Sequence, residues 1–283
     1  MNASDLPTNF SFPTLIRFGP GVVQELPQEC KKNGWIPLLV VTDPSVKTLP
    51  FFKNFLLSLA REGIEHHLHS DLHANPVESD VNRGAEIYRK NSCRAVLGFG
   101  GGAAMDTARA IALAANHSKK LFSYCEDVGG LDLITASIPP IITVPTTAGT
   151  GSEVGRSAVI SDDQTKKKRI LFHPSLLASK VYCDPELSES LPAPIAAATG
   201  MDALTHHLEA YLSKGFHPLC DGIALQGIQI AIKYLEKAVI DKDLESRSMM
   251  MACAMMGAVA FQKGLGLIHS MAHALSEIGR AHV

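Results

Sequence analysis

The stretch that decides the fold is residues 95–115, which read AVLGFGGGAAMDTARAIALAA. It opens with the apolar run Ala95–Phe99, passes through glycines, and continues into the apolar helical pattern of Met105–Ala115. An apolar run that ends in glycines before a helical pattern is typical of a strand–turn–helix unit. Glycines let a phosphate approach the backbone, and the free N–H groups at the start of the helix would bind it. A tight structural turn at Gly98–Gly102 explains the same residues, so this segment alone leaves both interpretations open.

The same alternation recurs on both sides of this stretch. The pattern predicts further strands at residues 38–42, 64–70 and 141–144, and helices at residues 51–61 and 78–90. Continuous apolar strands that alternate with helices predict an α/β fold, with a parallel sheet covered by helices on both faces. In such sheets ligands bind beyond the carboxyl ends of the strands.

The character of the sequence changes after about Asp184. Beyond this point the pattern predicts only helices, at residues 195–213, 221–237 and 247–275, with no strand. We therefore expect two domains that meet near Ser190. Residues 1–190 would form the α/β dinucleotide-binding domain, and residues 191–283 a helical domain.

Composition excludes several classes of protein. The chain has 283 residues, 46% of them hydrophobic, which is ample to build a core, and a net charge of −2. A near-neutral chain is not expected to bind nucleic acid or an anionic membrane, because such proteins carry a basic excess. The six cysteines form no CxxC motif and the N-terminus lacks signal-peptide features, so we expect reduced thiols and a cytoplasmic protein. The most apolar stretch, Met249–Phe261, is too short to span a bilayer.

Two further groups of residues suit a nucleotide. Asp43 ends the strand expected at residues 38–42, where a carboxylate would accept hydrogen bonds from a ribose and repel a 2′-phosphate. Alternatively, Asp43 forms an Asx turn before Pro44. The loop Thr146–Ser152 offers small hydroxyl residues and glycines after another strand, which suits a phosphate or ribose, although a plain connecting loop is equally compatible.

Two pairs of metal-binding residue types on apolar helices suggest a metal site. Asp202 and His206 are four residues apart, as are His269 and His273, so each pair lies on one helix face. Satisfied core histidines are the alternative. A buried carboxylate is costly unless it is paired or bound to metal. A mixed set of oxygen and nitrogen donors suits Fe²⁺ or Zn²⁺ better than Mg²⁺ or Ca²⁺.

Two long segments carry a family resemblance. Residues 184–209, with Asp184-Pro-Glu-Leu and Thr199-Gly-Met-Asp-Ala-Leu-Thr-His206, resemble the first signature of the iron-containing (group III) alcohol dehydrogenases. The segment Gly264–His273 resembles the start of the second signature, and the similarity runs from Phe18 to about Ser276. The resemblance implies an N-terminal Rossmann-like nucleotide-binding domain and a C-terminal all-helical metal-binding domain.

The resemblance also implies roles by position. Asp202, His206 and His269 would be ligands of Fe²⁺, with Zn²⁺ as the alternative metal, and His273 would help to bind substrate or transfer a proton. The cofactor would be NAD, in contact with Asp43, Gly100, Gly101, Gly102, Asp106, Thr146, Thr147, Thr150 and Lys168.

The implied reaction is hydride transfer between a primary alcohol and nicotinamide, or the reverse reduction of an aldehyde. The expected partners are a small alcohol or aldehyde and further copies of the chain in a homo-oligomer. Two alternatives remain. In the first, the chain is a relative on the same scaffold and resembles glycerol dehydrogenase or dehydroquinate synthase in its reaction. In the second, it is an inactive fragment that binds nucleotide.

The family pattern breaks after Ser276. The family supplies a fourth metal ligand, a histidine followed by glycine, somewhat beyond His269, whereas His282 here is followed by Val283. We therefore expect a C-terminally truncated chain with an incomplete helical domain. On this interpretation the native sequence ends near Ser276 and Glu277–Val283 are translated read-through.

Overall fold

The computed structural model describes residues 14–275. These residues form two compact units. The first comprises Thr14–Thr146 together with Arg156–Asp184, and the second comprises Thr147–Gly155 together with the chain from Pro185 onward.

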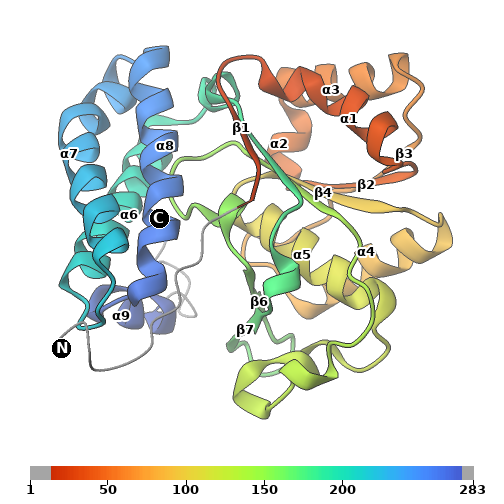
Figure 1. Cartoon of the computed structure of the whole chain (residues 1–283). Coiled ribbons are helices and arrows are strands. Elements are labelled where there is room, and N and C mark those ends of the chain that lie inside the picture. The colour runs from red at the N-terminus through yellow and green to blue at the C-terminus, as the bar shows by residue number, and fades with distance from the viewer. Residues whose placement is uncertain (1–13, 276–283) are drawn as a thin grey trace. The chain divides into compact units, whose positions relative to one another are not determined.

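The first unit is built on a six-stranded sheet of parallel strands in the order β1-β8-β5-β4-β2-β3 (Figure 1). Its strands are β1 (Ile16–Phe18), β2 (Leu38–Val41), β3 (His66–His69), β4 (Ala95–Gly100), β5 (Ile141–Pro145) and β8 (Lys180–Cys183). Its helices are α1 (Leu26–Asn33), α2 (Pro44–Thr48), α3 (Pro50–Arg61), α4 (Glu78–Lys90) and α5 (Gly102–Asn116). A separate antiparallel pair consists of β6 (Ser157–Ser161) and β7 (Lys168–Phe172). The parallel α/β fold expected from the sequence is confirmed.

The strand order reverses between β2 and β4. From β2 the chain moves to β3 on one side, and then returns to β4 on the other side before reaching β5. In open parallel sheets, ligands bind in the crevice at such a reversal, beyond the carboxyl ends of the strands. The residues that follow β2 and β4 lie at this position.

Two adjacent residues of β4 explain how helices cover both faces of the sheet. Side chains alternate between faces along a strand, so Gly98 and Phe99 point in opposite directions. Gly98 meets α5, where an added Cβ would lie 2.9 Å from the Cα of Met105. Phe99 meets α3, with its ring centroid 5.1 Å from that of Phe52 and 4.9 Å from that of Phe55. The glycine therefore lets α5 approach the strand closely, while an aromatic cluster fills the space under α3.

Four strands of the first unit were not expected from the sequence. β1 and β8 extend the sheet beyond β5, and β6 and β7 form the separate hairpin. β1 has only three residues, none of them fully buried, so it shows no apolar run. β8 reads KVYC and is buried throughout, but its polar Lys180 interrupts the pattern. Both strands are recruited by pairing with a neighbour rather than by their own composition.

The second unit is helical in its described part (Figure 1). Its helices are α6 (Ala193–Leu212), α7 (Pro218–Ile240), α8 (Leu244–Ala260) and α9 (Leu267–Leu275). Small side chains line the contact between α6, α7 and α8, including Ala203, Ala231 and Ala254, each at most 1% exposed. Such residues let helices approach closely. The expected absence of strands after Asp184 is confirmed for the described residues.

The single helix expected at residues 247–275 is wrong. α8 ends at Ala260, and α9 begins at Leu267 after a bend of 106°. Gly264 between them has φ of +134°, which a residue with a side chain rarely adopts. In residues 14–275, no helix by itself has both the length and the apolar character of a membrane span, whereas Leu244–Lys263 and the bent α9 pass that test jointly.

Candidate metal centre and nucleotide edge

Three predicted ligand residues meet inside the second unit. Asp202 and His206 lie one turn apart on α6, and α9 brings His269 against them. The Asp202 Oδ1 lies 3.3 Å from the His269 Nε2 and 3.8 Å from the His206 Nε2. The two imidazole rings are stacked, with centroids 4.4 Å apart. One donor atom from each residue falls within 4.8 Å of the others, so the predicted cluster is formed.

A fourth side chain fixes the orientation of His269. Glu209 is buried on α6, one turn beyond His206, and its Oε2 lies 2.5 Å from the His269 Nδ1. Its Oε1 accepts a hydrogen bond of 2.6 Å from the Ile268 N–H at the start of α9. A Cβ on Gly266 would lie 2.8 Å from Oε1, so a side chain at this position would displace the carboxylate. Glu209 therefore holds both the helix and the ring, and leaves the His269 Nε2 facing Asp202.

The two histidines differ electrostatically. Burial lowers the pKa of His206 to about 4, so its ring is neutral and available as a donor at neutral pH. Burial also opposes protonation of His269, but the hydrogen bonds to Asp202 and Glu209 outweigh it and raise the pKa of His269. The cluster without a cation therefore favours a proton on His269 beside the carboxylates.

The donor set fits a transition-metal ion. Two imidazoles and one carboxylate are the ligands that iron(II) sites with open positions use, and Zn²⁺ accepts the same donors. The largest donor separation, 4.8 Å, exceeds twice a metal–ligand bond of ~2.1 Å by about half an ångström, which small side-chain rotations close. In metal sites, the ring nitrogen of a ligating histidine that does not face the metal usually donates to a carboxylate. Glu209 occupies this position beside the Nδ1 of His269.

Other aromatic residues surround this cluster. The ring of Phe261 lies 5.1 Å from that of His206 and covers it on one side. His273 lies on α9 with its ring centroid 6.2 Å from that of His269, close to the cluster but outside the three donors. His207 is fully buried and its Nε2 bonds the Cys253 carbonyl at 2.9 Å, so it is a core histidine held by the backbone of α8.

The nucleotide candidates of the first unit lie at the strand reversal. The Oδ1 of Asp43 caps α2 by accepting from the N–H groups of Ser45 and Val46, at 3.0 and 2.9 Å. A Cβ on Gly100 would lie 3.1 Å from the Oδ2 of Asp43, so that oxygen is directed at the glycine turn after β4. The Asx turn is therefore formed by one oxygen, while the other is directed at the glycine turn, and the contact of Asp43 with a ribose stays a prediction.

The glycine turn leads into a helix whose first N–H groups have no side-chain cap. Gly101 is the N-cap residue of α5, and Gly102 begins the helix. The φ of Gly100 is +152°, a conformation that favours glycine. The Thr146 N–H donates to the Gly100 carbonyl at 3.0 Å and ties the end of β5 to this turn. These features match a phosphate-binding turn at a helix start.

Asp106 and Lys168 have structural contacts of their own. The Asp106 carboxylate accepts from Arg109 on its own helix at 3.2 Å and from the Val159 N–H at 3.0 Å. It therefore anchors β6 on α5. Lys168 begins β7 and pairs with Ser161. Their contacts with cofactor stay predictions.

Thr147 and Thr150 belong to the second unit, whereas Thr146 belongs to the first. Their loop packs on α6, because a Cβ at Gly149 would lie 2.8 Å from the Cβ of Thr199. The Thr150 hydroxyl oxygen accepts from the Ser152 N–H at 3.2 Å. The nucleotide roles of these threonines also remain predictions.

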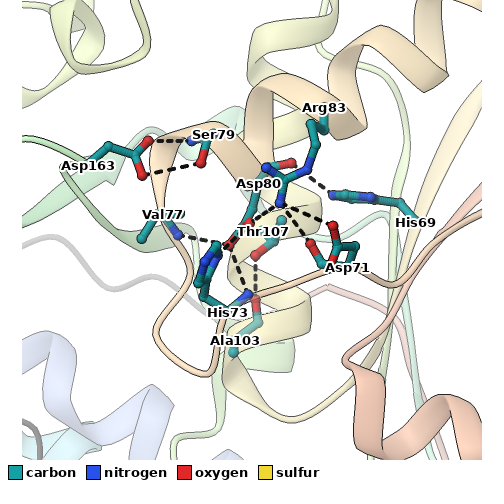
Figure 2. Close-up of polar contacts among 10 residues, drawn as sticks. All are labelled: His69, Asp71, His73, Val77, Ser79, Asp80, Arg83, Ala103, Thr107 and Asp163. Atoms are coloured by element: carbon teal, nitrogen blue, oxygen red, sulfur yellow. Dashed lines mark hydrogen bonds and ion pairs between the residues drawn. The ribbon is translucent and has the colours of Figure 1, made fainter.

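A buried carboxylate organises the loop that follows β3. Asp80 accepts from the N–H groups of His73 and Val77, each at 3.1 Å, and its Oδ1 lies 2.9 Å from the His73 Nδ1 (Figure 2). Arg83 adds an ion pair of 2.5 Å, and the His69 Nε2 donates to the Asp80 carbonyl at 2.8 Å. Sequence reasoning missed this network, which shapes the carboxyl edge of the sheet beside β2.

Sequence reasoning also gave no role to Glu209. Its signal was present, since Glu209 is an acid three residues beyond His206 on the same face of an apolar helix. Its partner was not visible, because His269 is 60 residues away along the chain. The predicted tail, including Glu277 and His282, lies outside the described residues.

Family comparisons cover most of the chain. The profile described as iron-containing alcohol dehydrogenase matches residues 13–185, and the profile of the C-terminal part of the Fe-containing alcohol dehydrogenase family matches residues 196–279.

Individual relatives agree. A 4-hydroxybutyrate dehydrogenase of Cupriavidus necator is 40% identical over 93% of this chain and 68% of its own length. A 1,3-propanediol dehydrogenase of Citrobacter freundii is 35% identical over 94% of this chain and 69% of its own. The chain thus spans about two thirds of these relatives.

Solved structures give the same fold. A 1,3-propanediol oxidoreductase superposes with a TM-score of 0.89 at 33% identity, covering 95% of this chain and 70% of that one. A sulfoacetaldehyde reductase from Bifidobacterium kashiwanohense in complex with NAD⁺ gives 0.87 at 30% identity, covering 96% and 72%. The Rossmann-like parallel-sheet domain and the helical domain are common to these structures and this chain.

Proposed function

The chain belongs to the iron-containing alcohol dehydrogenase family, whose members are oxidoreductases, and from this membership we propose that it interconverts a primary alcohol and its aldehyde with NAD. The observation that carries the proposal is the convergence of Asp202, His206 and His269 in one buried cluster. Relatives named as propanediol, methanol and butanol dehydrogenases support the substrate class.

We propose that these three residues hold Fe²⁺, with Zn²⁺ as the second candidate. A divalent cation bound there would polarise the alcohol oxygen and lower its pKa, while bound NAD would accept the hydride.

The surrounding side chains then have distinct tasks. Glu209 is a positioning residue that fixes the ring of His269 through its Nδ1. Phe261 covers His206 and excludes water from that side of the cluster. His273, next to His269 on α9, would take or give the hydroxyl proton of the substrate.

The proposed cofactor site follows the strand reversal of the first unit. Asp43 would bind the ribose hydroxyls through its Oδ2 and disfavour a 2′-phosphate, which implies NAD. Gly100, Gly101 and Gly102 would bind the pyrophosphate with backbone N–H groups. The remaining proposed contacts are Asp106, Thr146, Thr147, Thr150 and Lys168.

The proposal also includes the roles of the two domains, the partners of the chain and its location. Residues 1–190 would act as the nucleotide-binding domain and residues 191–283 as the metal-binding domain. The partners would be a small alcohol or aldehyde and further copies of the chain, with neither nucleic acid nor membrane. The scattered cysteines without a CxxC motif support a cytoplasmic location.

The test is turnover by the purified chain after anaerobic loading with Fe²⁺. We expect NADH oxidation with butyraldehyde, a loss of at least about 100-fold in Asp202→Asn, and no change in the exposed control Asp241→Asn. Turnover of glycerol alone, or of a heptulosonate phosphate, would favour the relatives on the same scaffold. Binding of NADH and metal without turnover of any of these would refute the proposal and leave the inactive nucleotide-binding interpretation.

A further inference from the structure

A small cavity lies within the second unit, and its lining includes none of the three clustered donors. It is lined by residues from α6, from the C-terminal end of α7 and from the start of α8, and by Ala148. All of its lining belongs to the second unit. The cavity encloses about 30 Å³, room for roughly two water molecules or the head of a small organic ion.

One wall of this cavity is a partly buried cation. Arg247 lies in the first turn of α8, and its Nε and Nη1 are buried. Neither nitrogen has a hydrogen-bond partner among residues 14–275. A guanidinium keeps its charge at every accessible pH, and a buried N–H group without an acceptor is costly. These two N–H groups of Arg247 therefore have no acceptor among the described side chains.

The remaining lining defines which acceptor fits. Lys242 adds a second positive charge at the solvent side, and no described lining residue carries a carboxylate. Leu191, Leu235 and Met250 line the rest of the cavity with apolar surface. The cavity thus joins a cationic end to an apolar wall.

We propose that this cavity binds the carboxylate group of a small organic acid. A carboxylate oxygen would accept from one of the two buried N–H groups of Arg247, since a hydrogen bond between a guanidinium and a carboxylate is charge-assisted. Lys242 would screen the charge from the solvent side, and a short alkyl tail would cover Leu235 and Met250. An inorganic oxyanion satisfies Arg247 but leaves the apolar wall exposed, so the carboxylate is the better match.

The test measures thermal unfolding and heats of binding of the full, metal-loaded chain with sodium acetate and sodium butyrate, at ionic strength held constant with chloride. We expect saturable binding with a Kd on the order of 1 mM. Ligand at about 100 times Kd should raise the Tm by roughly 5 °C or more. Arg247→Met should lose this response and, without carboxylate, melt no lower than the wild type. Lys214→Gln, an exposed cation of the same unit, should respond like the wild type.

A second variant separates binding from folding defects. Ala238→Leu fills the cavity without changing any charge, and it should lose the carboxylate response even if Arg247→Met fails to fold. An equal Tm rise in the wild type and in both variants would overturn the proposal, as would no response at about 100 times the expected Kd. A response to phosphate but not to acetate or butyrate would overturn the carboxylate assignment.

Discussion

Replacing Glu209 with glutamine should weaken metal binding by 10- to 100-fold. The Glu209 carboxylate accepts from the His269 Nδ1 at 2.5 Å and from the Ile268 N–H at 2.6 Å. A glutamine has one carbonyl oxygen for these two donors. If the oxygen stays with Ile268, the amide NH₂ faces Nδ1 and forces the His269 proton onto Nε2. That nitrogen is the one that faces Asp202, 3.3 Å away, so the donor atom is blocked.

The size of the effect follows from that bond. A hydrogen bond to a charged group contributes about 1.5–3 kcal/mol. Loss of such an outer partner of a metal ligand lowers metal affinity by about 10- to 100-fold, or ~1.4–2.7 kcal/mol.

The assay is a competition titration of Co²⁺ or Zn²⁺ against a chelator, with nitrogen NMR of the histidine tautomers as a second readout. Glu236→Gln, an exposed glutamate on α7, is the matched control and should bind like the wild type. Urea unfolding of both variants tests whether α9 remains folded. Metal affinity of Glu209→Gln within twofold of the wild type, with Nδ1 still protonated, would refute the positioning role.

Four further outcomes are expected. Asp43→Asn should narrow the preference for NAD over NADP by about tenfold, or ~1.4 kcal/mol, because a carboxylate no longer repels the 2′-phosphate; equal preference ratios in the two proteins would contradict this. Burial lowers the pKa of His69 despite the bond to the Asp80 carbonyl, so the unfolded state binds the proton more tightly than the folded state. The free energy of unfolding should therefore fall as the pH drops below about 6.5. The slope should be shallower in His69→Gln, measured by urea unfolding at several pH values. Gly98→Ala should destabilise the chain by about 1–3 kcal/mol, since its Cβ would lie 2.9 Å from the Met105 Cα, and an unchanged Tm would show that α5 can shift away. Removing metal with a chelator should lower the Tm, and restoring Fe²⁺ or Zn²⁺, but not Mg²⁺, should recover it.

The central strands could be predicted because each contains an apolar run that indicates a buried strand without reference to its neighbours. β2 reads LLVV and is buried throughout, so its apolar run signals a strand covered on both faces. β1 and β8 carry no such run, and they become strands by pairing side by side in the completed sheet. That pairing joins segments more than 150 residues apart, which local pattern cannot supply.

In the helical half, too, some elements could be predicted from local sequence and others could not. Apolar spacing located α6 and α7, but it continued without interruption across Gly264, where the backbone reverses into α9. A positive φ at one glycine is a tertiary requirement that hydrophobic periodicity does not record.

The candidate metal site was predictable in part. The spacing of Asp202 and His206 places both on one face of a helix, and this needs only helix geometry. The position of His269 beside these two residues was implied by family resemblance rather than by spacing. The contact between Glu209 and His269 depends on how α9 turns back over α6, and the cavity at Arg247 depends on three helices at once. Glu209 shares a helix face with His206, but no local pattern pairs it with His269, and none indicates the cavity.

The most direct test of the central claim is an anomalous-scattering map from crystals of the chain loaded with Fe²⁺ or Zn²⁺. We predict one strong peak at about 2.0–2.2 Å from the Asp202 carboxylate and from the Nε2 atoms of His206 and His269. A peak elsewhere would contradict the assignment of these three residues. So would the absence of a peak in crystals grown from protein that binds one metal ion per chain in solution.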